Sequence, residues 1–307
     1  MIYINLFLIL LFFMEKKDEN FLKIENHSIL PISKNQLKRL KKKEEWEKKK
    51  KEIRKFHKEK QKEKKRLKKE KFEEELKNNP KLLEEYNKQQ QIPHKTKKER
   101  NEEFLAKINN DGIKIVIDCD FENLMNEKSN ISMIRQISEI YHINKHTEKP
   151  FNLMLFNVGP ILLNLLKKNN YENWLGVKIF LKEQFETFDD FILKELYKNQ
   201  NTEKLNDLKQ KIFYLSADSE NEINDLNKDF TYIIGGIVDR NKYKFLSYNK
   251  AKKLGINHGK FPIGEYLNLN SSKVLTTNHT FAILNEFNLK NDWKEAFLSV
   301  IPKRKFE

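Results

Sequence analysis

The sequence predicts an α/β domain with a mostly parallel sheet, preceded by a basic helical N-terminal extension. Beyond residue 110, short apolar runs of strand length alternate with helical patterns, which is typical of parallel sheets. The N-terminal third is rich in Lys and Glu, and none of the 8 glycines occurs before Gly112. Such a segment can form a long helix but cannot bury a core of its own.

The chain starts with an apolar run at residues 1–14, MIYINLFLILLFFM. This run is shorter than the about 20 residues that a membrane-spanning helix needs. It lacks the positive flank and the cleavage site of a secretory signal, and organellar signals are Arg-rich and amphipathic. A short anchor and an incidental start both stay open for residues 1–33. We expect no membrane contact, and a nuclear or cytoplasmic location in preference to the mitochondrion.

Residues 34–110 form the basic extension and its linker. Between Lys38 and Lys71 there are 20 lysines and arginines against 7 glutamates, an excess of +13 in a chain of net charge +15. This excess indicates a polyanionic partner, either nucleic acid or an anionic membrane surface. A solvated helix without a partner is the alternative. The candidate phosphate-binding side chains of the extension are Lys38, Arg39, Lys48, Lys49, Arg54, Lys55 and Arg66.

The domain, residues 111–305, begins with the first apolar run. Continuous apolar runs suit strands that are buried on both faces, and they occur at 113–119, 151–156, 177–181, 211–216 and 231–234. Helical patterns lie between or after them, at 131–141, 161–166 and 276–287. The Lys/Asn-rich stretch at 182–210 is predicted to be an insertion that carries one helix.

Candidate ligand-binding loops cluster in the C-terminal third, at 214–220, 232–242 and 259–266, followed by KVLTTN at 273–278. Ligands of open α/β sheets bind where loops leave the carboxyl ends of strands. Neither G-x-G-x-x-G nor G-x-x-x-x-G-K-[ST] occurs, so a Rossmann dinucleotide site and a P-loop have no support. Each loop alone could equally be a plain turn.

A metal site has little support in the sequence. Cys119 is the only cysteine, so neither a disulfide within the chain nor a zinc site of several thiolates can form. His142 and His146 are four residues apart, but the glutamate of an H-E-x-x-H helix is missing, because Ile143 stands in its place. We therefore expect surface histidines and no metal.

The loops taken together and in this order resemble the tRNA (purine-9-N1)-methyltransferase family of the SPOUT methyltransferases. The resemblance covers about residues 100–305 and weakens at 145–210. The segments that carry it are IVIDCDFENLM at 115–125, IFYLSADSE, YIIGGIVDRNKYK, AKKLGI, FPIGEY, KVLTTNHTFAIL, DWKEAF and IPKRK. The resemblance implies a SPOUT-type fold with a C-terminal trefoil knot, although true knots are nearly absent from proteins.

The same resemblance implies a cofactor, S-adenosyl-L-methionine, held by the knot loops. The cofactor-binding residues would be Leu215, Ser216, Gly235, Gly236, Phe261, Pro262, Ile263, Val274, Leu275 and Thr276. It also implies tRNA as the substrate, activity without metal, a monomer, and no stable protein partner. Within the domain, Arg240, Lys242 and Lys244 could hold backbone phosphates near the target base.

The candidate catalytic residues are Asp239, Asp118, Gln136 and Asn241. Asp239 is the only acid of the GGIVDRNK loop and could accept the N1 proton of guanine, or it could cap a turn. Asp118 could line the site or start the next turn, and Gln136 could face the purine or be an ordinary polar helix residue. Whether guanine, adenine or both are accepted stays open. A catalytically inactive tRNA-binding scaffold and a DNA-binding nuclear protein are the alternative functions.

Overall fold

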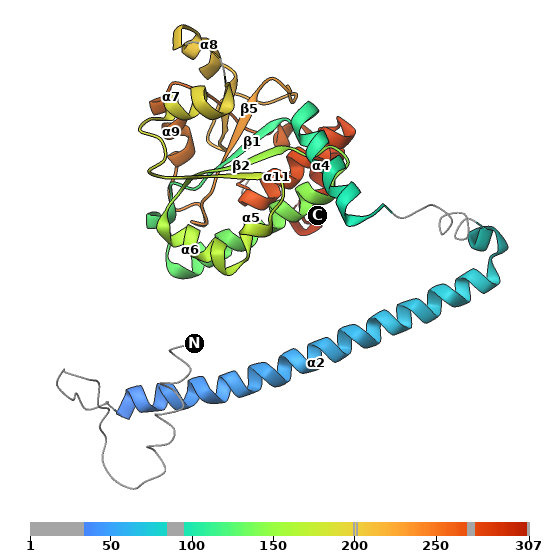
Figure 1. The fold of residues 1–307 in the computed structure, drawn as a ribbon. Coiled ribbons are helices and arrows are strands. Elements are labelled where there is room, and N and C mark those ends of the chain that lie inside the picture. The colour runs from blue at the N-terminus through green and yellow to red at the C-terminus, as the bar shows by residue number, and fades with distance from the viewer. Residues whose placement is uncertain (1–33, 85–94, 199, 201, 269–273, 306–307) are drawn as a thin grey trace. The chain divides into compact units, whose positions relative to one another are not determined.

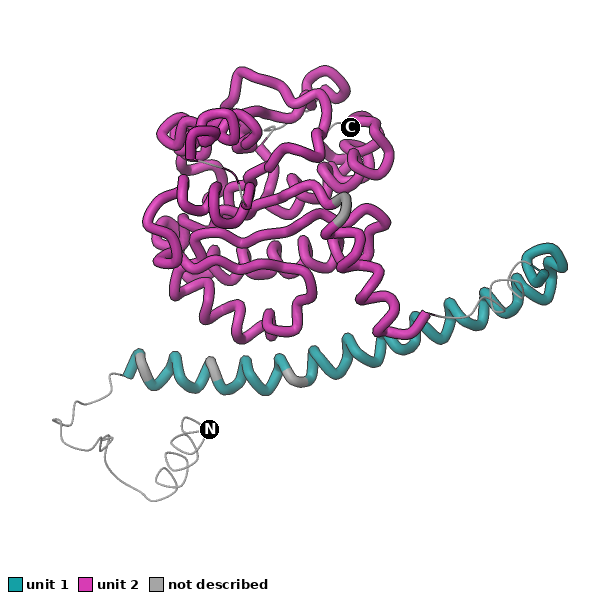
Figure 2. The backbone as a smooth tube through the Cα atoms, turned by 45° about the horizontal axis from the view of Figure 1, so that its top comes forward, with its two compact units in different colours: residues 1–94 teal, residues 95–307 magenta. Residues whose placement is uncertain are grey.

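The computed structural model describes residues 34–84, 95–198, 200, 202–268 and 274–305. The apolar run at residues 1–14 lies outside these ranges. The chain divides into two compact units, Met1–His94 and Lys95–Glu307, which Figure 2 shows in different colours. Of the helices in the described ranges, none combines the length and the apolar character that crossing a membrane requires.

The described part of the first unit is dominated by one helix, α2 (Lys34–Asn78), 45 residues long. This confirms the long helix predicted from the Lys/Glu-rich sequence. Most of its large apolar side chains are exposed, as at Trp46 (57%) and Phe56 (61%), whereas Leu76 near its end is buried. Ion pairs between neighbouring turns run along the helix, and Arg66 contacts Glu63 at 2.7 Å and Glu70 at 3.5 Å. The helix therefore presents a charged surface.

The second unit starts with helix α4 (Lys97–Asp111), so it begins earlier than the boundary at 110/111 expected from the sequence. The helix begins at a capping box, in which the Thr96 hydroxyl accepts the N–H of Glu99 and the Glu99 carboxylate accepts the N–H of Thr96. Phe104 and Ile108 are buried. A Cβ added at Gly176 would lie 2.7 Å from Ile108 Cδ1. Because α4 packs against the domain in this way, it belongs to the domain rather than to the linker.

The core of the domain is a six-stranded sheet in the order β3-β2-β1-β5-β4-β6, and every pairing is parallel. All five predicted strands are confirmed. The sixth was missed, because its three residues, Asn-His-Gly, form no apolar run. The strands are β1 (Lys114–Asp118), β2 (Asn152–Val158), β3 (Val177–Leu181), β4 (Ile212–Leu215), β5 (Thr231–Gly235) and β6 (Asn257–Gly259).

Helices cover both faces of the sheet (Figure 1). Successive side chains of β1 point to opposite faces, so Ile115 and Ile117 join one core while Val116 joins the other. The core of Ile115 and Ile117 includes side chains of α5 (Glu127–His146), α6 (Pro160–Lys168), α11 (Thr277–Lys290) and α12 (Trp293–Val300). The core of Val116 includes side chains of α7 (Phe188–Phe191), α8 (Leu205–Lys209) and α9 (Leu246–Leu254).

The predicted helices α5, α6 and α11 are confirmed, and the insertion at 182–210 holds more than one helix. It contains α7, a π-helical turn at Ile192–Leu196, a 3-10 turn at Thr202–Lys204 and α8. Phe156 and Phe180 of the sheet pack on Phe191, with ring centroids 4.1 and 5.3 Å apart, and this contact anchors the insertion. The trefoil knot stays a prediction. The strand order and pairing show which strands are neighbours, but they do not show whether the chain passes through a loop.

Candidate functional site

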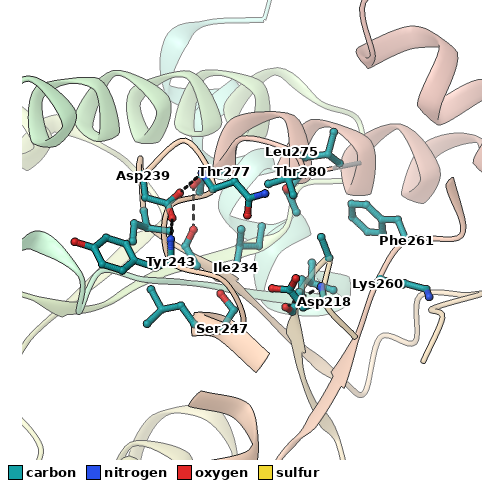
Figure 3. A pocket seen from close by; sticks show the side chains of 18 of the residues that line it. Asp218, Ile234, Asp239, Tyr243, Ser247, Lys260, Phe261, Leu275, Thr277 and Thr280 are labelled. Atoms are coloured by element: carbon teal, nitrogen blue, oxygen red, sulfur yellow. Dashed lines mark hydrogen bonds between the residues drawn. The ribbon is translucent and has the colours of Figure 1, made fainter. Parts of the chain in front are cut away.

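The described residues form a pocket at the carboxyl edge of β4, β5 and β6. Four segments distant in sequence meet there, and they include the three loops singled out in the sequence. Figure 3 shows Asp239 and Tyr243 at one end and Lys260 and Phe261 at the other. The lining residues are Leu215, Ser216, Ala217, Asp218, Ile234, Gly235, Ile237, Asp239, Asn241, Tyr243, Leu246, Ser247, Gly259, Lys260, Phe261, Ile263, Val274, Leu275, Thr277 and Thr280.

Most residues expected to bind the cofactor line this pocket. Gly236, Pro262 and Thr276 are not among its lining residues, although each is next to one in the chain. Gly236 donates its N–H to the Asp118 carbonyl at 2.8 Å, and a Cβ at Gly236 would lie 2.7 Å from that oxygen. A side chain at position 236 would therefore collide with the backbone at Asp118, which explains why this residue is glycine. Pro262 precedes the short helix α10 (Ile263–Tyr266), and Thr276 precedes α11.

Gly235 connects three parts of the pocket. Its carbonyl accepts a hydrogen bond from the Thr277 hydroxyl at 3.0 Å, which ties the start of α11 to the end of β5. A Cβ at Gly235 would lie 3.0 Å from Ser247 Oγ. Any larger residue would therefore displace Ser247 of α9, which also lines the pocket.

The loop after β5 is held by its own acid. One oxygen of Asp239 accepts the N–H of Asn241 at 3.0 Å, and the other accepts the N–H of Tyr243 at 2.9 Å. Arg240 and Asn241 adopt left-handed φ values of 55° and 62°. These two hydrogen bonds stabilise a turn that non-glycine residues disfavour. Asp239 and Asn241 both line the pocket, so the turn-capping role and access to a ligand coexist.

A second carboxylate, Asp218, lies in the pocket wall and was missed by the sequence reasoning. Its Oδ2 accepts the N–H of Phe245 at 2.9 Å, so the loop after β4 holds the far end of the Asp239 loop. The available signal was an acid that follows a buried strand in YLSADSE. The pocket thus contains two carboxylates from neighbouring strand ends, and each also positions backbone.

Asp118 does not line the pocket but lies in a buried charge network beneath it. Its side chain is 3% exposed, and its Oδ2 lies 2.6 Å from Lys250 Nζ and accepts the Tyr214 hydroxyl at 2.9 Å. Burial and the Asp118 charge raise the pKa of Tyr214 well above its usual value. Asp118 therefore holds a tyrosine and a lysine in place, and its Oδ1 accepts the N–H of Asp120 at 3.2 Å, as the turn-starting alternative expects. A catalytic role for Asp118 stays a prediction.

Asp120 extends this network toward the surface. Its carboxylate lies 2.9 Å from Lys250 Nζ and 2.8 Å from Lys182 Nζ. Burial raises the pKa of Asp120, but hydrogen bonds from Lys182 and Lys250 outweigh burial and hold the pKa below its usual value. Cys119 lies between these two acids in the sequence, and its side chain is buried. Burial raises the pKa of its thiol above the usual value.

Gln136 lies outside the pocket wall and contacts the helix that approaches it. Its Oε1 accepts the backbone N–H of Asn278 at 3.5 Å, a long hydrogen bond at the start of α11. The expectation that Gln136 faces the substrate purine therefore finds no direct support in this arrangement.

The remaining candidates lie at the surface. Arg240, Lys242 and Lys244 are exposed beside the pocket. His142 and His146 have ring centroids 4.3 Å apart, and His146 Nδ1 contacts the His142 carbonyl at 2.8 Å. In the ranges that the structure describes, no group of three or more His, Cys, Asp or Glu side chains could hold a metal ion.

Comparisons with known proteins agree with the geometry. A family model described as tRNA (guanine(9)-N(1))-methyltransferase TRM10/TRM10A matches residues 30–306. A tRNA (guanine(9)-N1)-methyltransferase of Schizosaccharomyces pombe is 35% identical over 89% of this chain and 80% of its own length. The enzyme of the same name from Candida glabrata is 35% identical over 71% of this chain and 70% of its own length.

Two solved structures are similar in fold as well as in sequence. A crystal structure of full-length spTrm10 in complex with SAH has a TM-score of 0.53 and 36% identity, over 63% of this chain and 95% of that chain. A crystal structure described as spTrm10(74) has a TM-score of 0.51 and 36% identity, over 62% of this chain and 94% of that chain.

Proposed function

Because the chain belongs to the tRNA (guanine(9)-N(1))-methyltransferase TRM10/TRM10A family, we propose that it transfers a methyl group from S-adenosylmethionine to N1 of the purine at tRNA position 9. One observation carries the proposal. Four of the segments that resemble the family, IFYLSADSE, YIIGGIVDRNKYK, FPIGEY and KVLTTNHTFAIL, converge on one pocket, although its lining extends in the chain from Leu215 to Thr280. The related crystal structure of a complex with SAH, the demethylated cofactor, supports the same ligand here.

The pocket wall fits the chemistry of this cofactor. Leu215, Ile234, Phe261 and Leu275 offer apolar surface for the adenine ring. The carboxylates of Asp218 and Asp239 can accept hydroxyl donors and attract a positive charge. When bound, S-adenosylmethionine supplies an electrophilic methyl group on a sulfonium. The task that remains for the chain is to bind, to orient and to handle a proton.

Asp239 is the residue that we propose for the proton. Guanine N1 carries a proton that must leave when the methyl group arrives, and a carboxylate within hydrogen-bond reach can accept it. Each Asp239 oxygen accepts one backbone N–H, and a carboxylate oxygen has two lone pairs, so acceptor capacity remains on both. Asn241, in the same turn, lines the pocket beside it. Adenine N1 carries no proton, so an adenine substrate would not need this step.

We place the tRNA over the exposed cations of the pocket rim and the basic helix. Arg240, Lys242 and Lys244 are exposed next to Asp239, and the +13 excess of Lys38–Lys71 lies within α2. Phosphate neutralisation by Lys and Arg supplies most sequence-independent affinity for nucleic acid. Position 9 lies inside the folded tRNA core, so its base must be exposed before its N1 edge can react. We further propose a monomer that works without metal in the nucleus or cytoplasm.

The proposal is tested with purified protein, labelled S-adenosylmethionine and tRNA transcripts that carry G9 or A9. The expected result is transfer of one methyl group per tRNA, undiminished by EDTA. An inactive tRNA-binding scaffold would bind tRNA in the same assay without transferring the label, and calorimetry with SAH would then decide whether the pocket still binds the cofactor. A DNA-binding protein would prefer duplex DNA over tRNA in competition.

A further inference from the structure

Phe245 has an unusual backbone conformation. Its φ is +58°, in the left-handed region, and it precedes α9 without any side-chain cap hydrogen bond. For a bulky residue this conformation is a genuine outlier, whereas glycine adopts it without cost. The residue is 49% exposed, so burial offsets little of that cost.

The backbone of Phe245 is fixed to the rim of the pocket. Its N–H donates to Asp218 Oδ2 at 2.9 Å, and its carbonyl accepts the N–H of Asn249 at 2.8 Å. Tyr243 before it and Leu246 after it both line the pocket. The backbone that carries the ring is therefore fixed at this rim by hydrogen bonds on both sides of the residue.

One edge of the ring has an aromatic neighbour. Phe245 meets Tyr248 edge to face at 6.0 Å between centroids, and Tyr248 in turn packs on His258 at 4.6 Å. The cation of Lys252 lies 4.4 Å from the centre of the Tyr248 ring. Phe245 thus has aromatic contact with Tyr248, while about half of the residue stays exposed.

The chain segment that leads to the ring is rich in cations. Arg240, Lys242 and Lys244 precede Phe245 closely in the chain, and all three side chains are exposed. The segment RNKYKF therefore interleaves cations with aromatic rings, a combination that suits a nucleic-acid backbone together with its bases. An apolar protein partner would not neutralise the cations, and an acidic one would offer the ring no surface to pack on.

We propose that the Phe245 ring stacks on a base of the tRNA that becomes unstacked when the position 9 purine is exposed. This inference rests on the proposed function and adds a contact to it. A base that leaves the folded tRNA core loses its stacking partners, and an aromatic ring at the rim replaces one of them. The neighbouring cations hold the phosphates on either side.

The test compares Phe245→Gly, Phe245→Leu and Phe245→Tyr by equilibrium binding of a G9 transcript in the presence of SAH. Glycine fits the left-handed backbone, so Phe245→Gly should fold with an unfolding temperature at or above that of the parent protein. Its tRNA affinity should fall by roughly 5- to 150-fold. Phe245→Tyr should bind within about twofold of the parent, because it keeps the ring, and Phe245→Leu should lie closer to the Gly variant.

Two further readouts separate stacking from other roles. The slope of log K against log salt should be the same for the parent and for Phe245→Gly, since no phosphate contact is lost. SAH affinity should also be unchanged. The matched control is Asn291→Gly, which relieves another left-handed residue, φ +54°, at the far end of α11. It should leave tRNA affinity as it is.

Parent-level tRNA binding by Phe245→Gly or Phe245→Leu would overturn the proposal, as would a changed salt slope. Loss of SAH affinity in the Gly variant would assign the ring a role within the fold instead. These outcomes differ from failure of the proposed function, in which the parent protein itself would bind tRNA without methylating position 9.

Discussion

The carboxylate of Asp239 accepts the backbone N–H of Tyr243 at 2.9 Å, while its other oxygen accepts the N–H of Asn241 at 3.0 Å. The only acid of this loop therefore shapes the loop that presents it to the pocket. From the sequence, Asp239 could either cap a turn or accept a proton. The structure allows both roles in this one side chain, so a test has to measure them separately.

Asp239→Asn is expected to lower methylation of a G9 transcript by roughly 10²–10⁴-fold, because the substitution removes a general base. The amide also cannot accept both backbone N–H groups, since its nitrogen is a donor. A9 activity, if present, should fall much less, because adenine N1 has no proton to lose. Rates under single-turnover conditions check this. Equal losses on G9 and A9 would point to loop geometry instead, and a lost SAH affinity would assign Asp239 a purely structural role.

Lys250→Met should destabilise the domain by about 3–5 kcal/mol, since it leaves the buried Asp118 carboxylate without its cationic partner at 2.6 Å. Urea denaturation measures the change. The matched control is Lys253→Met on the same helix, where the side chain is exposed and the change should be within about 0.5 kcal/mol. A Lys250 variant as stable as the control would show that the ion pair does not hold this network together.

The ion pairs of Asp120 should make stability depend on pH in the acid range. Its pKa in the folded protein lies below the usual value, so the stabilisation is present above the unfolded value of about 3.9 and is lost as pH falls through the folded value. Asp120→Asn should therefore be less stable than the parent at pH 7, and the difference should shrink below about pH 4. The exposed control Asp225→Asn should change stability at pH 7 by no more than about 0.5 kcal/mol. A difference that is constant down to pH 3 would contradict the assignment.

Deleting residues 1–80 should weaken tRNA binding while leaving SAH affinity nearly unchanged, because every pocket residue lies in the second compact unit. Each phosphate contact that is lost should reduce the slope of log K against log salt by about 0.7–0.9. Binding titrations at several salt concentrations measure this slope. If the slope of the truncated protein equals that of the full chain, α2 does not touch the phosphates.

Periodicity and composition located most of the fold. Long apolar runs such as IKIVIDC identified the strands, because strands buried on both faces leave an unbroken signal. The three-residue β6 left none, since Asn-His-Gly has no apolar residue. Helix α4 was assigned to the linker because most of its residues are charged or polar. Its few apolar residues, which include the buried Phe104 and Ile108, are too sparse to indicate that it packs on the domain.

The site was predictable where it follows strand ends and not where it depends on packing. Leu215 and Gly235 end or follow buried strands, and both line the pocket. Asp118 also ends a strand, but its side chain turns toward Lys250 and Tyr214, which are more than 90 residues away in the chain. No local pattern reveals such a contact. For the same reason, the link from Asp218 to Phe245 was not visible in the sequence.

Mass-spectrometric mapping of tRNA after incubation with the protein and S-adenosylmethionine tests the central claim most directly. With a G9 transcript, the proposed function predicts a single added methyl group, on N1 of the purine at position 9. A methyl group at any other position, or an unmodified transcript under conditions in which the protein binds both SAH and tRNA, would contradict it.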